Sequence, residues 1–118
     1  MFDESDIIFK YTDEMAVADG VLVDLDKIFP RYKGKGLFRY ATSNLLSKGY
    51  IVDYDVKKAA IFDLLMQGQH IVKKQSDNLE NSDWFYSGKI ELPDGTQQEI
   101  FIAQNETGRL TLMLPEDY

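Results

Sequence analysis

The spacing of apolar residues changes along the chain, and this change limits the folds that the chain can adopt. In residues 60–72, apolar positions recur every three or four residues, which lines one face of an α-helix. In residues 84–92, 99–104 and 110–114 the pattern instead has a period of two, the spacing typical of β-strands. We therefore predict an α+β fold in which N-terminal helices pack on a C-terminal three-stranded antiparallel β meander.

Turn residues support the predicted meander. Pro93, Asp94, Gly95 and Thr96 separate its first two strands, and residues 105–108 separate the second pair. Three strands need a covering layer, for which we expect a long helix over residues 56–74. The length of 118 residues favours a single domain, residues 1–118.

The N-terminal part predicts shorter elements. Thr12 is a candidate N-cap for a helix that runs from Asp13 to Ala18 or Asp19, and Gly20 fits the positive φ of a helix end. Residues 21–25 are mostly apolar and include the β-branched Val21 and Val23, as in a buried extended piece or a short strand. Apolar spacing then predicts another helix over residues 37–47.

One glycine leaves two alternatives open. Gly68 lies in the apolar stripe of the long helix, where glycine costs about 1 kcal/mol relative to alanine. It either ends the helix or permits close packing at that turn.

Paired aspartates allow a structural and a chemical interpretation. Asp24 or Asp26 is expected to cap the segment that follows. Asp53 or Asp55 is expected to cap the long helix. The alternative is a metal-dependent hydrolase or nucleic-acid-modifying enzyme that uses Asp19, Asp24 or Asp26 around a divalent ion. We favour capping, and we expect no metal site and no cofactor.

The composition restricts catalytic chemistry. The chain has no cysteine, and His70 is its single histidine. A catalytic triad, a thiolate metal site and a histidine-rich metal site are therefore very hard to build. The sequence identifies no catalytic residue.

Charge is distributed unevenly. The net charge is −7, yet residues 27–76 hold ten bases and three acids, while the segments on either side each sum to −7. An acidic chain argues against direct nucleic-acid binding. The three segments either neutralise one another or form a dipolar surface that steers a protein partner.

A basic loop provides one group of interaction candidates. Arg31, Lys33, Lys35 and Arg39 surround two glycines that would let a phosphate approach the backbone. The loop lacks both the Walker and the dinucleotide-binding spacing, so an exposed basic surface is the favoured interpretation.

An aromatic strand provides the other group. Trp84, Phe85 and Tyr86 place aromatic rings on both faces of one strand, and Phe101 is a candidate cross-strand neighbour of Phe85. The N-terminal segment with Ile7, Ile8 and Phe9 is expected to cover this second face. The alternative is an interface, most simply that of a homodimer.

No segment approaches the roughly 20 apolar residues of a membrane span, and the acidic N-terminus lacks the features of a signal peptide. We expect a cytoplasmic location and no membrane partner.

Motifs at both ends carry a resemblance. Tyr11-Thr12, Ala16 and Asp19-Gly20-Val21-Leu22-Val23-Asp24, together with Leu110-Thr111-Leu112-Met113-Leu114-Pro115-Glu116-Asp117, resemble a family of short prokaryotic proteins of unknown function that phages, plasmids and other mobile elements often carry. The resemblance implies a small cytoplasmic accessory protein and supplies no activity, cofactor or site residue.

These observations lead to three hypotheses. The first is an acidic interaction protein that binds a host or phage protein, with nucleic-acid mimicry as one version. The second is the metal-dependent enzyme described above. The third is a small-ligand module with a cavity between the long helix and the sheet.

Overall fold

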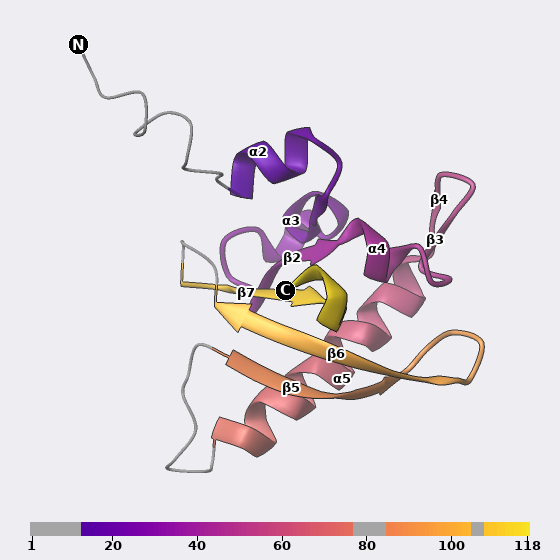
Figure 1. Ribbon diagram of the computed structural model, residues 1–118. Helices are drawn as coiled ribbons and strands as arrows, with labels where there is room; N and C mark the ends of the chain where they lie inside the picture. Colours follow the sequence, from indigo (N-terminus) through magenta and orange to yellow (C-terminus); the bar gives the residue numbers. More distant parts are fainter. Residues whose placement is uncertain (1–12, 77–84, 105–107) are drawn as a thin grey trace.

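The computed structural model describes residues 13–76, 85–104 and 108–118, and Figure 1 shows the order of their helices and strands. The helices are α2 (Asp13–Ala18), α3 (Leu25–Ile28), α4 (Ser43–Leu46) and α5 (Lys58–Ser76), with short 3₁₀ helices η1 (Pro30–Tyr32) and η2 (Pro115–Asp117). The strands are β1 (Leu22–Asp24), β2 (Phe38–Thr42), β3 (Ile51–Val52), β4 (Asp55–Val56), β5 (Phe85–Glu91), β6 (Gln97–Gln104) and β7 (Leu110–Met113).

The main sheet has five strands in the order β1-β2-β7-β6-β5. Strands β2 and β7 run parallel, with Ala41 opposite Leu112, and the other neighbours are antiparallel. The fold is α+β, but the predicted C-terminal three-stranded antiparallel meander is wrong, because β7 pairs on its far side with a strand from the N-terminal half. The sheet is therefore mixed and contains strands from both halves of the chain.

The error arises in residues 37–47, for which a helix was predicted. These residues form β2 followed by the single turn α4. Strand β2 lies inside the sheet and is buried on both faces at Phe38, Tyr40 and Ala41, so its apolar residues do not alternate. The Thr42 hydroxyl then accepts a hydrogen bond from the Leu45 backbone N–H at 3.2 Å and begins α4.

The other local predictions are confirmed for α2 and β1 and closely for α5, but not for the cap of α5. Helix α2 ends before Gly20, whose φ is 79°, and β1 follows. Helix α5 begins and ends two residues later than predicted. Asp53 and Asp55 do not cap it, since they belong to the β3–β4 hairpin, where Asp53 and Tyr54 have positive φ. The expected Thr12 cap and the expected cover from Ile7, Ile8 and Phe9 lie outside the described residues.

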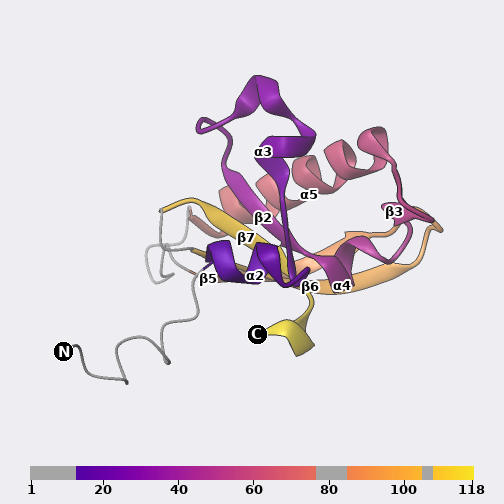
Figure 2. The ribbon, with the colours of Figure 1, turned by 90° about the horizontal axis from the view of Figure 1, so that it is seen from above.

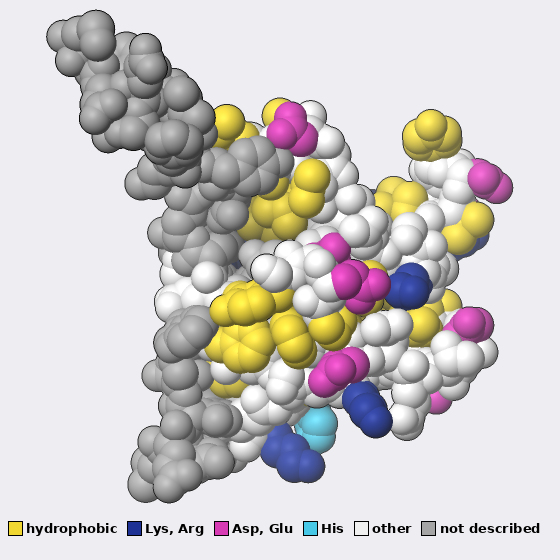
Figure 3. Space-filling model, in the orientation of Figure 1, with side chains coloured by type: hydrophobic (Ala, Val, Ile, Leu, Met, Phe, Trp, Pro, Cys, Tyr) yellow, Lys and Arg dark blue, Asp and Glu magenta, His cyan; other side chains and the backbone are white. Residues whose placement is uncertain are grey.

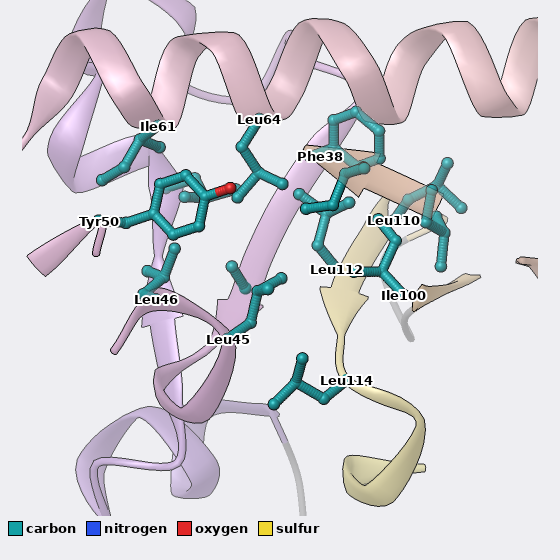
Figure 4. Close-up of a cluster of buried hydrophobic side chains, with 14 of the residues drawn as sticks. Phe38, Leu45, Leu46, Tyr50, Ile61, Leu64, Ile100, Leu110, Leu112 and Leu114 are labelled. Atoms are coloured by element: carbon teal, nitrogen blue, oxygen red, sulfur yellow. The ribbon is translucent and has the colours of Figure 1, made fainter. Parts of the chain in front are cut away.

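Helix α5 and helix α3 lie on one face of the sheet, while η2 lies on the other (Figure 2). Buried side chains from β2, α4, α5, β6 and β7 form one cluster (Figure 4). Ile61 and Leu64 of α5 are fully buried in this cluster. In the described parts of the chain, no helix is long and apolar enough to cross a membrane.

Two glycines set the distance between α5 and the sheet. Gly68 lies within α5, and a Cβ added there would be 3.0 Å from Phe38 Cζ and 3.1 Å from Leu112 Cδ2. A Cβ at Gly88 of β5 would be 2.8 Å from Ile71 Cδ1. The alternative in which Gly68 permits close packing is thus the one that the structure shows.

Candidate interaction site

A hollow lies beside α5, between this helix and the segment that runs from α3 to β2. Its volume is about 150 Å³, and we call it the α5 groove. Its apolar lining comes from both walls: Leu25, Phe29, Leu37 and Phe38 on one side, and Phe62, Leu65 and Met66 on the other. The groove combines segments that are more than twenty residues apart in the chain.

Three large apolar side chains at the groove stay partly in solvent. Leu37 is 43% exposed, Phe62 46% and Met66 50%. Phe62 and Met66 are four residues apart, so they lie on the same flank of α5. The Phe62 ring meets the Phe29 ring edge-to-face at a centroid distance of 6.3 Å, which joins the two walls.

An ion pair fixes the wall opposite α5. Asp26, in the first turn of α3, accepts two hydrogen bonds of 2.7 Å from the Nη1 and Nη2 groups of Arg109. It also accepts the Gly34 backbone N–H at 3.1 Å. Arg109 further donates to the carbonyl oxygens of Gly36 at 2.8 Å and Phe38 at 3.1 Å. One guanidinium therefore holds α3, the following loop and β2 together.

The same ion pair sets the protonation of Asp26. The hydrogen bonds from Arg109 hold the pKa of this carboxyl below its ordinary value, against the opposing effect of burial. Asp26 is 7% exposed. It remains charged at neutral pH and is already neutralised by its partner.

Arg39, one of the predicted interaction residues, is also used inside the fold. It donates to Asp24 from Nε at 3.2 Å and from Nη2 at 3.3 Å, and its Nε lies 3.5 Å from Asp26. Its guanidinium also lies 4.9 Å from the centroid of the Tyr40 ring. Asp24 in turn caps α3 by accepting the Asp26 backbone N–H, as predicted.

The other predicted cations differ from Arg39. Arg31, Lys33 and Lys35 are exposed, and none of them forms an ion pair with another described residue. Lys27 of α3 shares both properties. With respect to the described residues, the basic loop thus presents unpaired positive charge beside the α5 groove.

The three aspartates of the metal hypothesis do not converge. Asp19 is exposed after α2, while Asp24 and Asp26 are bound by arginines. Among residues 13–76, 85–104 and 108–118, no group of three histidine, cysteine, aspartate or glutamate residues is arranged to hold a metal ion. Among the described residues, Asp19, Asp24 and Asp26 therefore form no common metal site.

The predicted aromatic pair is present on the sheet face opposite α5. Phe85 and Phe101 are diagonal cross-strand neighbours whose ring centroids are 5.1 Å apart. Tyr118 contacts both rings edge-to-face, at 5.0 Å and 5.8 Å. Apolar atoms gather beside the C-terminal turn in Figure 3, where they form a patch on this face. Tyr118 is 66% exposed, and Phe85 and Phe101 are themselves only partly buried.

The flank of α5 that faces β5 is closed by two glutamines. The Gln67 side chain accepts the Glu91 backbone N–H at 2.7 Å and donates to the Glu91 carbonyl at 3.1 Å. Gln75 makes the same two contacts with Ser87. Because β5 is an edge strand, these amides occupy backbone groups that another strand would otherwise bind.

Away from the α5 groove, the space between α5 and the sheet is filled by side chains. Tyr50, 1% exposed, lies there against Ile61 and Leu64 (Figure 4). Its hydroxyl is the only buried side-chain polar atom of the described residues that has no hydrogen-bond partner. Burial raises the pKa of Tyr50 to about 12.

The prediction from sequence missed the residues that build the groove. Phe62 and Met66 lie beside the buried stripe of α5, and their four-residue spacing was the available signal. Arg109 had no such signal, because its contact with Asp26 joins residues 83 positions apart.

Comparison of the chain with protein-family models, curated proteins and solved structures finds no match.

Proposed function

We propose that the protein is a non-enzymatic interaction protein that binds a segment of another protein in the α5 groove. One observation carries this proposal. Leu37, Phe62 and Met66 are each about half exposed around one hollow, although the opposite flank of the same helix is closed by hydrogen bonds. Grouped apolar exposure of this kind marks interaction surfaces.

The size of the groove indicates what it can take. An apolar space of about 150 Å³ holds a group the size of a benzene ring. It therefore fits one leucine, methionine or phenylalanine side chain, and burying such a side chain contributes about 1.5–3 kcal/mol. Interfaces commonly depend on a few anchors of this type, surrounded by weaker contacts.

The mimicry version of the interaction hypothesis receives less support. Asp24 and Asp26 are bound by arginines, and Asp117 accepts hydrogen bonds from Thr42 and Asn44. On the face shown in Figure 3, most acidic side chains of the described residues are separated by neutral and apolar atoms. A mimic of a phosphate backbone needs a continuous row of free carboxylates.

The resemblance of the two end motifs provides the context of the proposal. It favours an accessory protein of a mobile element, acting on a protein of the host or of the element itself. A homodimer through Phe85, Phe101 and Tyr118 is a separate prediction, which light scattering of a Phe101→Ser variant would test.

A displayed library of random peptides tests the groove directly. Peptides selected on the native protein are expected to bind Met66→Lys at least tenfold more weakly in fluorescence anisotropy. Val52→Lys is the matched control, because Val52 is 45% exposed and lies on the β3–β4 hairpin. Failure to select any peptide, or equal losses in both variants, would contradict the proposal.

A further inference from the structure

We infer that the segment bound in the α5 groove is acidic, with one apolar anchor and carboxylates close to it in sequence. This inference rests on the function proposed above and adds the chemistry of the partner. The argument depends on which charges near the groove are already neutralised and which are free.

Residues 24–39 form the wall of the groove that faces α5, together with the loop beyond it. They contain two acids and five bases. Both acids are neutralised within the fold, Asp24 by Arg39 and Asp26 by Arg109. Four exposed cations remain without an ion pair to any described residue: Lys27, Arg31, Lys33 and Lys35.

These cations adjoin the groove. A second hollow of about 460 Å³ is lined by Lys27, Lys33 and Arg39, and it shares Asp26 with the α5 groove. Lys35 immediately precedes Gly36 and Leu37, which line the groove itself. A ligand anchored between Phe62 and Leu37 would thus extend over free positive charge.

Complementary charge supplies both selectivity and faster association. Carboxylates on the partner would pair with the free lysines, whereas an added cation on the partner would be repelled. Exposed pairs of this kind are individually weak and are screened by salt. The inference therefore predicts a preference that fades at high ionic strength, while the apolar anchor still binds.

The selected peptides test this inference. Those that bind most tightly are expected to carry two or more aspartates or glutamates within about four residues of a leucine, methionine or phenylalanine. Their affinity should fall about tenfold in the double variant Lys33→Gln/Lys35→Gln, and by a similar factor when NaCl is raised from 50 to 500 mM. The control Lys48→Gln/Lys89→Gln changes the net charge equally at positions that line neither hollow.

The outcomes separate the two proposals. Peptides that carry an apolar anchor but no acids, and that bind the double variant normally, would overturn the acidic partner and leave the groove intact. Failure to select any peptide would overturn both. Light scattering without peptide addresses self-association: a dimer that Met66→Lys dissociates would make a second copy the occupant and would also overturn the inference.

Discussion

The two flanks of α5 differ in how far the rest of the fold covers them. Toward β5, Gln67 and Gln75 bind the backbone of the edge strand. Toward α3 and β2, Phe62 and Met66 stay about half exposed beside a hollow. The flank of α5 next to the edge strand β5 thus carries polar side chains that bind the strand. The other flank carries apolar side chains, and no described residue covers them fully.

This difference shows where association is prevented and where it is allowed. An open edge strand is a general template for pairing with other chains. The two glutamines reduce that risk at β5, since each side-chain amide offers a donor and an acceptor, as a neighbouring strand would. The remaining apolar exposure of α5 lies on the opposite flank, at one site. The following predictions test this contrast, from the largest expected effect to the smallest.

The wall of the α5 groove that faces α5 is held in place by the ion pair between Asp26 and Arg109. Asp26→Asn is expected to lower the free energy of unfolding by about 3 kcal/mol, because the largely buried Arg109 loses its charged partner. Urea denaturation measures this loss. Asp24→Asn is the control, with an expected loss of about 1 kcal/mol, because Asp24 provides a cap and a more exposed ion pair.

The same pair predicts a dependence on pH. The pKa of Asp26 is lowered in the fold, so its contribution is complete above the ordinary value of 3.8 and is lost as the pH falls through the folded value. The native protein should therefore lose stability more steeply than Asp26→Asn below about pH 4. Equal slopes for both proteins would show that the pair does not contribute in this way.

The closed flank can be opened by removing both amides. Gln67→Ala/Gln75→Ala is expected to lower the free energy of unfolding by about 1–2 kcal/mol, because four hydrogen bonds are exchanged for bonds with water. More importantly, light scattering should show association that increases with concentration. Gln69→Ala, on the groove side, is the control. A double variant that associates no more than the native protein would contradict the sealing role.

Between the flanks, Gly68 tests how closely α5 contacts the sheet. Gly68→Ala is expected to destabilise the protein by about 1 kcal/mol. Overpacking destabilises by about 1–3 kcal/mol, whereas the higher helix propensity of alanine stabilises by about 1 kcal/mol. The neighbours at 3.0–3.1 Å would have to move. Ala59→Gly, at an exposed position of α5, measures the propensity term alone. A stabilised Gly68→Ala variant would contradict the tight fit.

Local signals in the sequence predicted the positions of α2, α5 and strands β5, β6 and β7, since each has its own periodicity and turn residues. They could not predict the five-stranded sheet. Strand β2 is buried on both faces, so it lacks the alternation that identifies a half-exposed strand. Its parallel pairing with β7 places Ala41 opposite Leu112, and the local sequence around either residue does not indicate this long-range contact.

The candidate site was predicted only in part, for a similar reason. The basic loop was identified, but composition could not show that Arg39 is paired while Lys33 and Lys35 form no ion pair with another described residue. That distinction depends on which aspartates the fold brings near each cation. Gln67 was missed as well, because its role appears only once β5 lies beside α5.

Tyr50 is buried under the first turns of α5, against Ile61 and Leu64 (Figure 4). Tyr50→Phe is expected to stabilise the protein by about 1 kcal/mol, because it removes a buried hydroxyl that has no hydrogen-bond partner among the described residues. The raised pKa adds a second readout: the native protein should lose stability as the pH rises from 10 through about 12, and the variant should lose less. A destabilised variant would show that the hydroxyl has a partner in solution, such as a bound water.

The smallest effect on stability is expected in the groove itself. Met66→Gln should change the free energy of unfolding by no more than about 0.5 kcal/mol, because Met66 is 50% exposed and glutamine has a similar helix propensity. Leu64→Ala, two residues earlier and fully buried, should cost at least about 2 kcal/mol in the same urea titration. Peptide binding should show the reverse order, with a large loss for Met66→Gln. If Met66→Gln instead destabilised the protein as much as Leu64→Ala, Met66 would belong to the core, and the contrast between the two flanks of α5 would not hold.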